Sequence, residues 1–509
     1  MTQTSPAQAI PQTDDIRPWP ALFSLVLGFF MILVDLTIVT VATPTIIDKL
    51  HASVNETLWV SSAYMLSYAV PVLIMGRLGD RFGSKKLYLT GLTVFTVASL
   101  WCGLAGSHAL FGSAAGIGML ILARVVQGFG ASMITPQTMA IITRIFPAAQ
   151  RGQAMAVWGA TAGVAMVVGP ILGGVLTTGL GWEWIFFVNI PVGVIGFYLA
   201  VRNVPALSTN DHHFDWLGVA LSGVGLFLLA FGIQQGHSEH WAGWIIAMII
   251  GGVAMLGVFV FWQSRNKQEP LVPLSVFRDR NFSVSNIAIT VMGFVGVSMG
   301  YPLMLWAQAV LGYSATKAAL LLFPMAIMSI ILAKPVGGLT DRIHPRYIVT
   351  TGFVLSMIGM FSLTTQLKEH TSIALVALFQ VILGAGNAFI WAPTAATANR
   401  NLPLNLAGAG AGVYNATRQV GSVVGSAAIA VMMSSRLAHY LPGAGGVSGE
   451  AGAHRVPEQF RAPFAHAMQQ SLLLPASIYV IGLVAVLFYE RPKHSGYAGA
   501  APVAAPVEG

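Results

Sequence analysis

The chain contains fourteen apolar runs, each close to the length of a helix that crosses the hydrocarbon core of a bilayer, about 20 residues. Charged residues make up only 9% of the sequence and hydrophobic residues 55%, which is typical of integral membrane proteins rather than soluble domains. We therefore predict an all-α integral membrane fold with fourteen transmembrane helices. The runs lie near residues 20–43, 57–76, 86–106, 116–139, 153–177, 184–201, 215–235, 242–262, 283–309, 316–337, 347–366, 372–396, 409–433 and 470–489.

The basic residues test this number of spans, because one missed or invented span would invert the side of every later loop. Most of the 26 Lys and Arg residues fall in loops on the side of the N-terminus. Cytoplasmic loops carry an excess of Lys and Arg, so we expect both termini to be cytoplasmic and the chain to lie in the cell (inner) membrane. The first apolar run is longer than a signal-peptide core of ~7 to 15 residues, so we expect a retained first span.

An internal repeat divides the spans into two halves. The segment GRLGDRFGSKKLYLTG (76–91), after the second span, returns in degenerate form as GGLTDRIHPRYIVTTG (337–352), after the tenth. Two related halves with a site between them are the usual build of secondary transporters. The predicted organisation is a cytoplasmic tail at 1–19, a six-helix bundle at 20–203, two inserted helices at 204–265, a second six-helix bundle at 266–490 with an outer loop at 435–469, and a cytoplasmic tail at 491–509.

Composition and motifs argue against several other functions. The formal charge of +8 is spread over short connections, so nucleic-acid binding is not expected. The single Cys102 excludes an intramolecular disulfide, and the twelve His residues lie in loops or at span ends, so we expect no metal site. There is no ATP-binding motif G-x-x-x-x-G-K-[ST] and no convincing pair of nucleophile and base. We expect no cofactor and no enzymatic activity, and the proton motive force as the energy source.

Asp35 is the only one of the eighteen acidic residues that lies deep inside an apolar run. A carboxylate there costs at least ~2.5 kcal/mol on insertion scales, so its presence is by default a functional hypothesis. Counted at ~1.5 Å per residue, Asp35 and Arg124 both lie ~12 to 14 Å below the outer surface. Arg124 could keep Asp35 ionised when close and let it take up a proton when the two separate. The alternative is an ion pair that only holds helices together.

The first copy of the repeat resembles the loop motif of the major facilitator superfamily, G-x-L-x-D-R-x-G-R-[KR]. Ser84 stands where that family commonly has Arg. Glycines let two helix ends approach closely, and Asp80 could meet the positive N-terminal end of a helix from the other half. Such a contact would stabilise one access state and would be broken in the other. The predicted gating residues are Gly76, Gly79, Asp80, Arg81, Gly83 and Lys85, with Leu78 also matching the motif, and Asp341 and Arg342 in the second copy.

Three further segments are similar to the fourteen-span drug:proton antiporter branch of that superfamily (EmrB/QacA-like). They are VDLTIVTVATPTI (34–46), where Thr40 replaces the usual Asn, LARVVQGFGAS (122–132), and GVAMVVGPILGGVL (163–176) followed by GWEWIFFVNIPVG (181–193). The resemblance implies the major facilitator fold, proton coupling by Asp35 and Arg124, and export.

The third of these segments is the motif associated with exporters. Its expected functional residues are Gly163, Gly169, Pro170, Gly173 and Gly174. The glycines permit close backbone packing, while Pro170 removes one helix hydrogen bond and introduces a bend. A bent, glycine-faced helix is a plausible rocking surface between the halves. The alternative is static helix packing.

A substrate cavity is expected between the halves, near mid-membrane. Arg418 lies about ten residues into the thirteenth span, and could contact substrate or cap another helix. Candidate cavity residues are Gln127, Tyr414, Asn415, Arg418, Trp306 and Trp391. Aromatic and Met residues suit a promiscuous apolar cavity, although such residues more often face lipid or pack against other helices.

The leading hypothesis is a proton-driven exporter of amphipathic drugs or toxic compounds that works by alternating access. An alternative is export of an endogenous lipid, metabolite or self-made antibiotic by the same mechanism, and a remote alternative is a non-transporting membrane receptor or scaffold. The expected partners are a small amphipathic substrate, protons and the lipid bilayer, together with a periplasmic adaptor if the host has an outer membrane.

Overall fold

The computed structural model describes residues 17–52, 54–112, 116–147, 150–207, 209, 215–236, 239, 241–266, 270–340, 342–403, 406–441 and 456–491. Every regular element among these residues is a helix. Thirteen stretches are long and apolar enough to cross a membrane, and the helix pair α2 and α3 forms a fourteenth. With that pair counted as one span, the prediction of an all-α fold with fourteen spans is confirmed.

The first group of helices, which we call the N-half, corresponds to the first six spans. It comprises α1 (Pro18–Leu50), α2 (Val54–Ala69), α3 (Val72–Phe82), α4 (Ser84–Leu104), α5 (His108–Phe111), α6 (Ile117–Ile145), α7 (Arg151–Gly179), α8 (Trp184–Phe187) and α9 (Asn189–Asn203). The second span bends by 44° between α2 and α3. The bend coincides with Pro71, which has no N–H to donate to the preceding turn.

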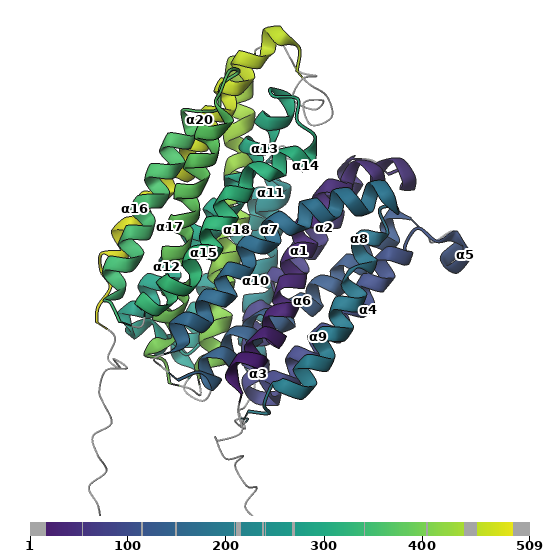
Figure 1. Cartoon of the computed structure of the whole chain (residues 1–509). Coiled ribbons are helices and arrows are strands. Elements are labelled where there is room, and N and C mark those ends of the chain that lie inside the picture. Colours follow the sequence, from purple (N-terminus) through teal and green to yellow (C-terminus); the bar gives the residue numbers. More distant parts are fainter. Residues whose placement is uncertain are drawn as a thin grey trace, which may run out of the picture.

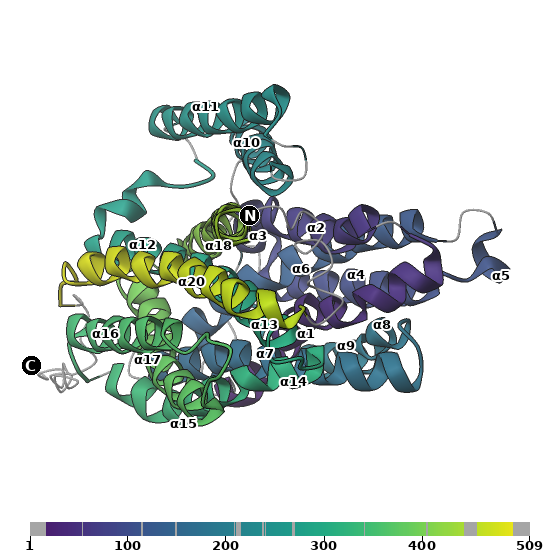
Figure 2. The ribbon, with the colours of Figure 1, turned by 90° about the horizontal axis from the view of Figure 1, so that it is seen from above.

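The two inserted spans are α10 (Trp216–Gln235) and α11 (Gly243–Arg265). They pack against each other, and Figure 2 shows them beside the main body of the molecule, with α10 toward α18 and α2. The outermost helix, α11, leaves 63% of Ile250 and 61% of Phe261 exposed. Apolar side chains with that exposure are expected of a helix that faces lipid.

The second group, which we call the C-half, corresponds to the last six spans. It comprises η4 (Leu274–Arg278), α12 (Arg280–Ser298), α13 (Gly300–Ala309), α14 (Ala315–Ala319), η5 (Leu320–Leu322), α15 (Phe323–Thr340), α16 (Pro345–Thr364), α17 (Ile373–Arg400), α18 (Ala407–Tyr440) and α20 (Glu458–Val486). The two halves lie side by side (Figure 1). We call the end where α1 begins and α20 ends the proximal end, and the opposite end the distal end.

The outer loop expected at 435–469 is shorter in the structure, because residues at both of its ends belong to helices. Helix α18 continues to Tyr440, and α20 already begins at Glu458. The added turns of α20 are stabilised by burial of Phe464 and Met468 in the core, which the polar residues around them concealed in the sequence.

The carboxylate of Asp215 joins the start of α10 to the last turn of α11. This residue caps α10 through the Gly218 N–H at 2.8 Å, and it accepts hydrogen bonds from Trp262 Nε1 at 2.9 Å and Gln263 Nε2 at 2.7 Å in α11. The N–H of Leu271, on the segment that leads into the C-half, also points to it at 3.3 Å. Burial works toward a higher pKa of Asp215, but these hydrogen bonds outweigh it, so the pKa lies below its ordinary value.

Asp215→Asn should destabilise the protein, because four donors lose a charged acceptor, and a buried donor left unsatisfied costs about 1–3 kcal/mol. Since the folded-state pKa is depressed, the contribution should be complete above about pH 4 and be lost as the pH falls through that pKa. Thermal unfolding of the detergent-solubilised protein at several pH values measures this. Glu490→Gln, which removes a half-exposed ion pair to Arg280, is the control. An equal loss in both variants would contradict the assignment.

Candidate functional site

The carboxylate of Asp35 lies in a closed cluster of polar side chains inside the N-half. Asp35, in α1, is fully buried and forms an ion pair with Nη1 of Arg124 in α6. Its other oxygen accepts hydrogen bonds from Gln127 Nε2 at 3.0 Å and from Asn189 Nδ2 at 3.1 Å. The structure therefore brings together the two residues that the depth estimate paired, and their role in proton coupling stays a prediction.

Arg124 is also held by α2, independently of Asp35. Its Nε donates to the Val60 carbonyl at 3.1 Å, and its guanidinium carbon lies 4.0 Å from the centroid of the Tyr64 ring. A cation over an aromatic face is attracted by the ring quadrupole. Nη1 donates to Gln127 Oε1 at 2.7 Å as well. Arg124 would therefore keep several partners if the carboxylate were neutralised.

The chemistry available to this cluster is the exchange of one proton. A guanidinium cannot be deprotonated in a protein, so a proton that enters would bind the carboxylate of Asp35. That step would replace the ion pair with a neutral acid beside an uncompensated cation, which is strongly unfavourable unless the surroundings rearrange. Protonation of Asp35 can thus favour a different helix arrangement.

Asn189, the first residue of α9, belongs to this cluster but was not singled out in the sequence. Besides Asp35 it binds Ser99 Oγ at 3.0 Å, and Ser99 donates to the Phe186 carbonyl at 2.9 Å. The available signal is an amide inside the apolar segment IFFVNIPVG. The contact joins α9 and α4 to the cluster on α1 and α6.

Asp80 forms a second buried ion pair, at the proximal end of the interface between the halves. Its Oδ1 accepts from Arg144 Nη2 at 2.5 Å, and its Oδ2 accepts from the backbone N–H of Ala409 at 3.1 Å. Ala409 lies in the first turn of α18, where free N–H groups and the helix dipole favour an anion. The expected contact with a helix of the other half is therefore present. Asp80 is fully buried in α3 rather than in a loop, and its partner Arg144 lies in the last turn of α6, beyond the predicted end of the fourth span at residue 139.

The glycines of the first repeat copy are required by close packing around Asp80. A Cβ atom on Gly76 would lie 2.5 Å from the Gly408 carbonyl oxygen and 2.9 Å from the Gly412 Cα of α18. A Cβ on Gly79 would overlap the side chain of Gln137 in α6, which donates to the Met75 carbonyl. At the turn between α3 and α4, Gly83 has φ +98°, a conformation that L-residues with side chains rarely adopt.

The remaining predicted gating residues lie away from that contact. The guanidinium of Arg81 packs over the neighbouring Phe82 ring, with 5.2 Å from its carbon to the centroid, and Lys85 donates to the Val201 carbonyl at 2.9 Å. Arg342 is exposed, and Asp341 lies outside the described residues. The gating role of the whole set stays a prediction.

The glycines of α7 face two different neighbours. A Cβ on Gly169 would overlap Thr37 of α1, and one on Gly173 would lie 3.0 Å from the Ile38 carbonyl oxygen of the same helix. On the side toward the C-half, a Cβ on Gly174 would lie 2.6 Å from Thr316 Oγ1, while Gly163 has more space, with Ala326 and Ser329 3.8 Å away. Pro170 lies between these glycines inside the helix. Helix α7 therefore connects α1, which carries Asp35, to the C-half.

A cavity with an empty volume of about 510 Å³, partly open to the outside, lies where α7 meets α15 and α17. Its walls are mainly small apolar residues of both halves, with Met325, Ser329, Asn387 and Trp391 as the larger or polar side chains. The buried Oδ1 of Asn387 has no hydrogen-bond partner. Of the residues expected at a substrate cavity, Trp391 lines this one.

Several other candidate cavity residues are packing residues in this structure. Trp306 is fully buried in the C-half and donates its indole N–H to the Lys368 carbonyl at 3.1 Å. Tyr414 and Asn415 are fully buried in α18, and Gln127 belongs to the Asp35 cluster. None of the four lines either of the two cavities described for this structure. Aromatic and amide side chains at these positions are oriented by helix packing, which the sequence does not reveal.

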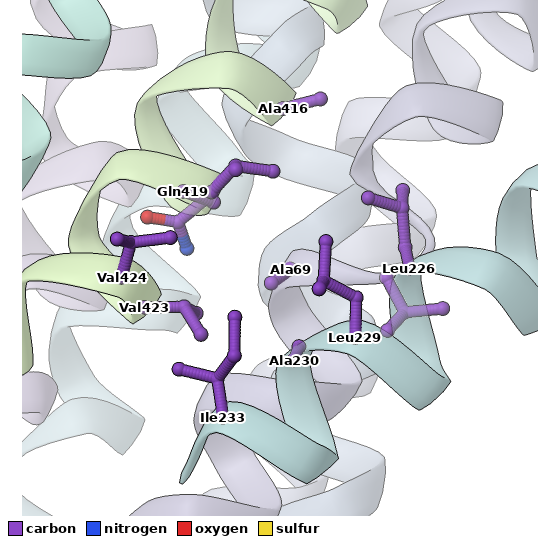
Figure 3. A pocket seen from close by; sticks show the side chains of 11 residues that line it. Ala69, Leu226, Leu229, Ala230, Ile233, Ala416, Gln419, Val423 and Val424 are labelled. Carbon is purple, nitrogen blue, oxygen red and sulfur yellow. The ribbon is translucent and has the colours of Figure 1, made fainter. Parts of the chain in front are cut away.

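The second cavity, with an empty volume of about 350 Å³, lies between α2, the inserted helix α10 and α18 (Figure 3). Its lining is aliphatic except for Gln419. The neighbouring Arg418 does not line it, and is directed at the N-half instead, where Nη2 donates to the hydroxyl of Tyr68 at 3.2 Å. Arg418 therefore lines neither of these two cavities, and its side chain donates to Tyr68 rather than to the end of a helix. No group of three His, Cys, Asp or Glu side chains in the described part of the chain could hold a metal ion.

Comparison with known proteins gives similar sequences and folds along most of the chain. A family model described as Major Facilitator Superfamily matches residues 25–426. The uncharacterized MFS-type transporter Rv1250 of Mycobacterium tuberculosis is 51% identical, over 93% of this chain and 81% of its own. The multidrug export protein EmrB of Haemophilus influenzae is 30% identical, over 81% and 80%. The solved proton:xylose symporter XylE has a TM-score of 0.63 and 14% identity, covering 92% and 94% of the two chains, so this likeness concerns the fold alone.

Proposed function

Because the chain belongs to the major facilitator superfamily, we propose that it is a proton-coupled secondary exporter of amphipathic drugs or toxic compounds. The observation that supports this most directly is the buried Asp35 cluster, in which a single carboxylate within a membrane span can take up a proton. The similarity to a multidrug export protein, at 30% identity, supports drugs as the cargo and export as the direction.

We further propose that both termini are cytoplasmic and that the described state is closed on that side. Support comes from close contacts between the halves at the proximal end. Asp80 binds the first turn of α18, Gly76 meets Gly408, and a Cβ on Gly337 of α15 would lie 3.0 Å from the Gln153 Cα of α7. In this mechanism a proton from outside binds Asp35, the proximal contacts open, and the proton leaves as substrate enters from the cytoplasm or the inner leaflet.

A second candidate, export of an endogenous lipid, metabolite or self-made antibiotic that carries a negative charge, is favoured by Arg418. This side chain lies within the span formed by α18 and is only 9% exposed, and its Nε has no hydrogen-bond partner. Among the described residues, no carboxylate forms an ion pair with it. A buried cation without a countercharge attracts an anion.

The test is proton flux in vesicles reconstituted with the purified protein and a pH-sensitive dye inside. A transported compound added on one side should drive protons in the opposite direction, and an imposed pH gradient should drive accumulation of that compound. Cationic dyes, fatty acids and neutral antibiotics serve as probes. A preference for the anionic probes would select the second candidate. Transport that neither responds to a pH gradient nor moves protons would refute proton coupling.

A further inference from the structure

The hydrogen bond between Arg418 and Tyr68 connects the two halves in the membrane interior. Arg418 lies in α18 of the C-half and Tyr68 in α2 of the N-half, and the tyrosine is 1% exposed. The donor is a permanent cation, and hydrogen bonds with a charged partner are roughly twice as strong as neutral ones. Separation of the halves would leave the guanidinium without this partner.

The hydroxyl of Tyr68 is fixed from the other side by the N-half. It lies 2.9 Å from Thr135 Oγ1 in α6, and both residues are buried. Tyr68 is therefore positioned by α6, the helix that also carries Arg124, and presents its oxygen to Arg418. The hydrogen bond between Tyr68 and Arg418 therefore depends on the position of α2 relative to α6.

Tyr68 is also linked to the proton site through Tyr64, one turn earlier in α2. The two ring centroids are 6.2 Å apart, and the Tyr64 ring packs directly on the guanidinium of Arg124. Arg124 in turn pairs with Asp35. A continuous path of contacts therefore leads from Asp35 through Arg124, Tyr64 and Tyr68 to Arg418 in the other half.

We propose that Tyr68 and Arg418 are positioning residues for proton coupling, forming a latch that holds the halves together while Asp35 and Arg124 remain paired. This proposal rests on the proposed function. Loss of the Asp35 ion pair removes one of the partners that fix the Arg124 guanidinium beside Tyr64, and a shift of that side chain reaches the latch through α2. The latch stabilises the unprotonated, proximally closed state, and its removal makes that state easier to leave.

The latch predicts a shift in the pH dependence of transport with a definite sign. A contact present only in the unprotonated state opposes proton binding, so Tyr68→Phe should move the half-maximal pH of transport upward by about one unit, since one unit corresponds to ~1.4 kcal/mol. Arg418→Met should produce a similar shift. The double variant should shift no further than either single variant, because both changes remove the same bond.

Tyr88→Phe is the matched control. Tyr88 is also fully buried, and its hydroxyl donates to the carbonyls of Ser24 at 3.0 Å and Leu25 at 3.2 Å, but these contacts lie within the N-half. Its loss should lower thermal stability and leave the half-maximal pH unchanged. The latch is overturned if Tyr68→Phe keeps the wild-type pH profile, if the Tyr88→Phe profile shifts equally, or if the two latch variants are additive.

A second measurement separates failure of the latch from failure of proton coupling. Spin labels on Lys86→Cys and Tyr347→Cys, both exposed near the proximal ends of α4 and α16, report the distance between the halves by pulsed electron paramagnetic resonance. At fixed pH, Tyr68→Phe should increase the share of molecules with separated labels, whereas Tyr88→Phe should not. This result would support the latch even if transport were not coupled to protons, and an unchanged distance distribution would refute it.

Discussion

Asp35→Asn is expected to abolish proton-driven efflux while the protein still folds and inserts. The amide keeps the shape of the side chain and can accept a hydrogen bond from Arg124 or Gln127, but it cannot bind or release a proton. One proton exchanged for a neutral substrate gains ~1.4 kcal/mol per pH unit and ~2.3 kcal/mol per 100 mV. At one pH unit and 100 mV this energy sustains a gradient of roughly 500-fold. In Asp35→Asn, the ratio of substrate concentrations on the two sides of the membrane should stay near one.

The gradient is measured in reconstituted vesicles with an imposed pH difference and membrane potential. Asp35→Glu keeps a carboxyl group and should retain part of the coupling, so it distinguishes proton exchange from a simple packing requirement. Downhill equilibration of substrate by Asp35→Asn would demonstrate that the variant is folded. Accumulation by Asp35→Asn to the wild-type level would refute the role of Asp35.

Gly76→Ala, which adds a single methyl group, is expected to prevent closure of the proximal end. The new Cβ would lie 2.5 Å from the Gly408 carbonyl oxygen and 2.9 Å from the Gly412 Cα, and these backbone atoms of α18 cannot turn aside as a side chain could. Overpacking of this kind typically costs about 1–3 kcal/mol. The closed state should lose roughly a factor of 5 to 150 in population relative to the open state.

The expected result is a longer distance between labels at the proximal ends of α4 and α16, with a corresponding loss of transport. Gly118→Ala is the matched control, because Gly118 lies in α6 and a Cβ there would meet no atom within 4 Å. The control should transport normally. If Gly76→Ala gives the wild-type distance distribution, the close approach of α3 and α18 does not control access.

The sequence predicted the helices and the Asp35 pair because both depend on simple periodic geometry. Apolar length identifies spans, and a constant rise per residue places Asp35 and Arg124 at one depth. The same argument does not reveal rotation about each helix axis. Asn189 and Tyr64 could therefore not be assigned to the cluster, although they belong to it.

The contacts near the proximal end illustrate a second limit. Asp80 was matched to a motif, and its meeting with a helix of the other half was expected from charge and dipole. The predicted fourth span ended at residue 139 and left Arg144 outside it, yet Arg144 lies in the last turn of α6 and is half-buried against Asp80. Trp306 was named as a candidate cavity residue with packing as the alternative, and in this structure it is fully buried and donates to the Lys368 carbonyl. Whether neighbouring helices cover Arg144 and Trp306 depends on tertiary packing, which the sequence does not show.

Among the described residues, those that bind the Asp35 carboxylate lie within the N-half, and this location constrains how the molecule can move. Arg124, Gln127 and Asn189 belong to the same six spans as Asp35, so a rigid-body rotation of the halves leaves these distances unchanged. For protonation of Asp35 to separate the ion pair, as proposed, α1 has to move relative to α6 within the N-half. Because α7 packs on α1 through Gly169 and Gly173, it should slide with α1, so that the N-half behaves as two blocks.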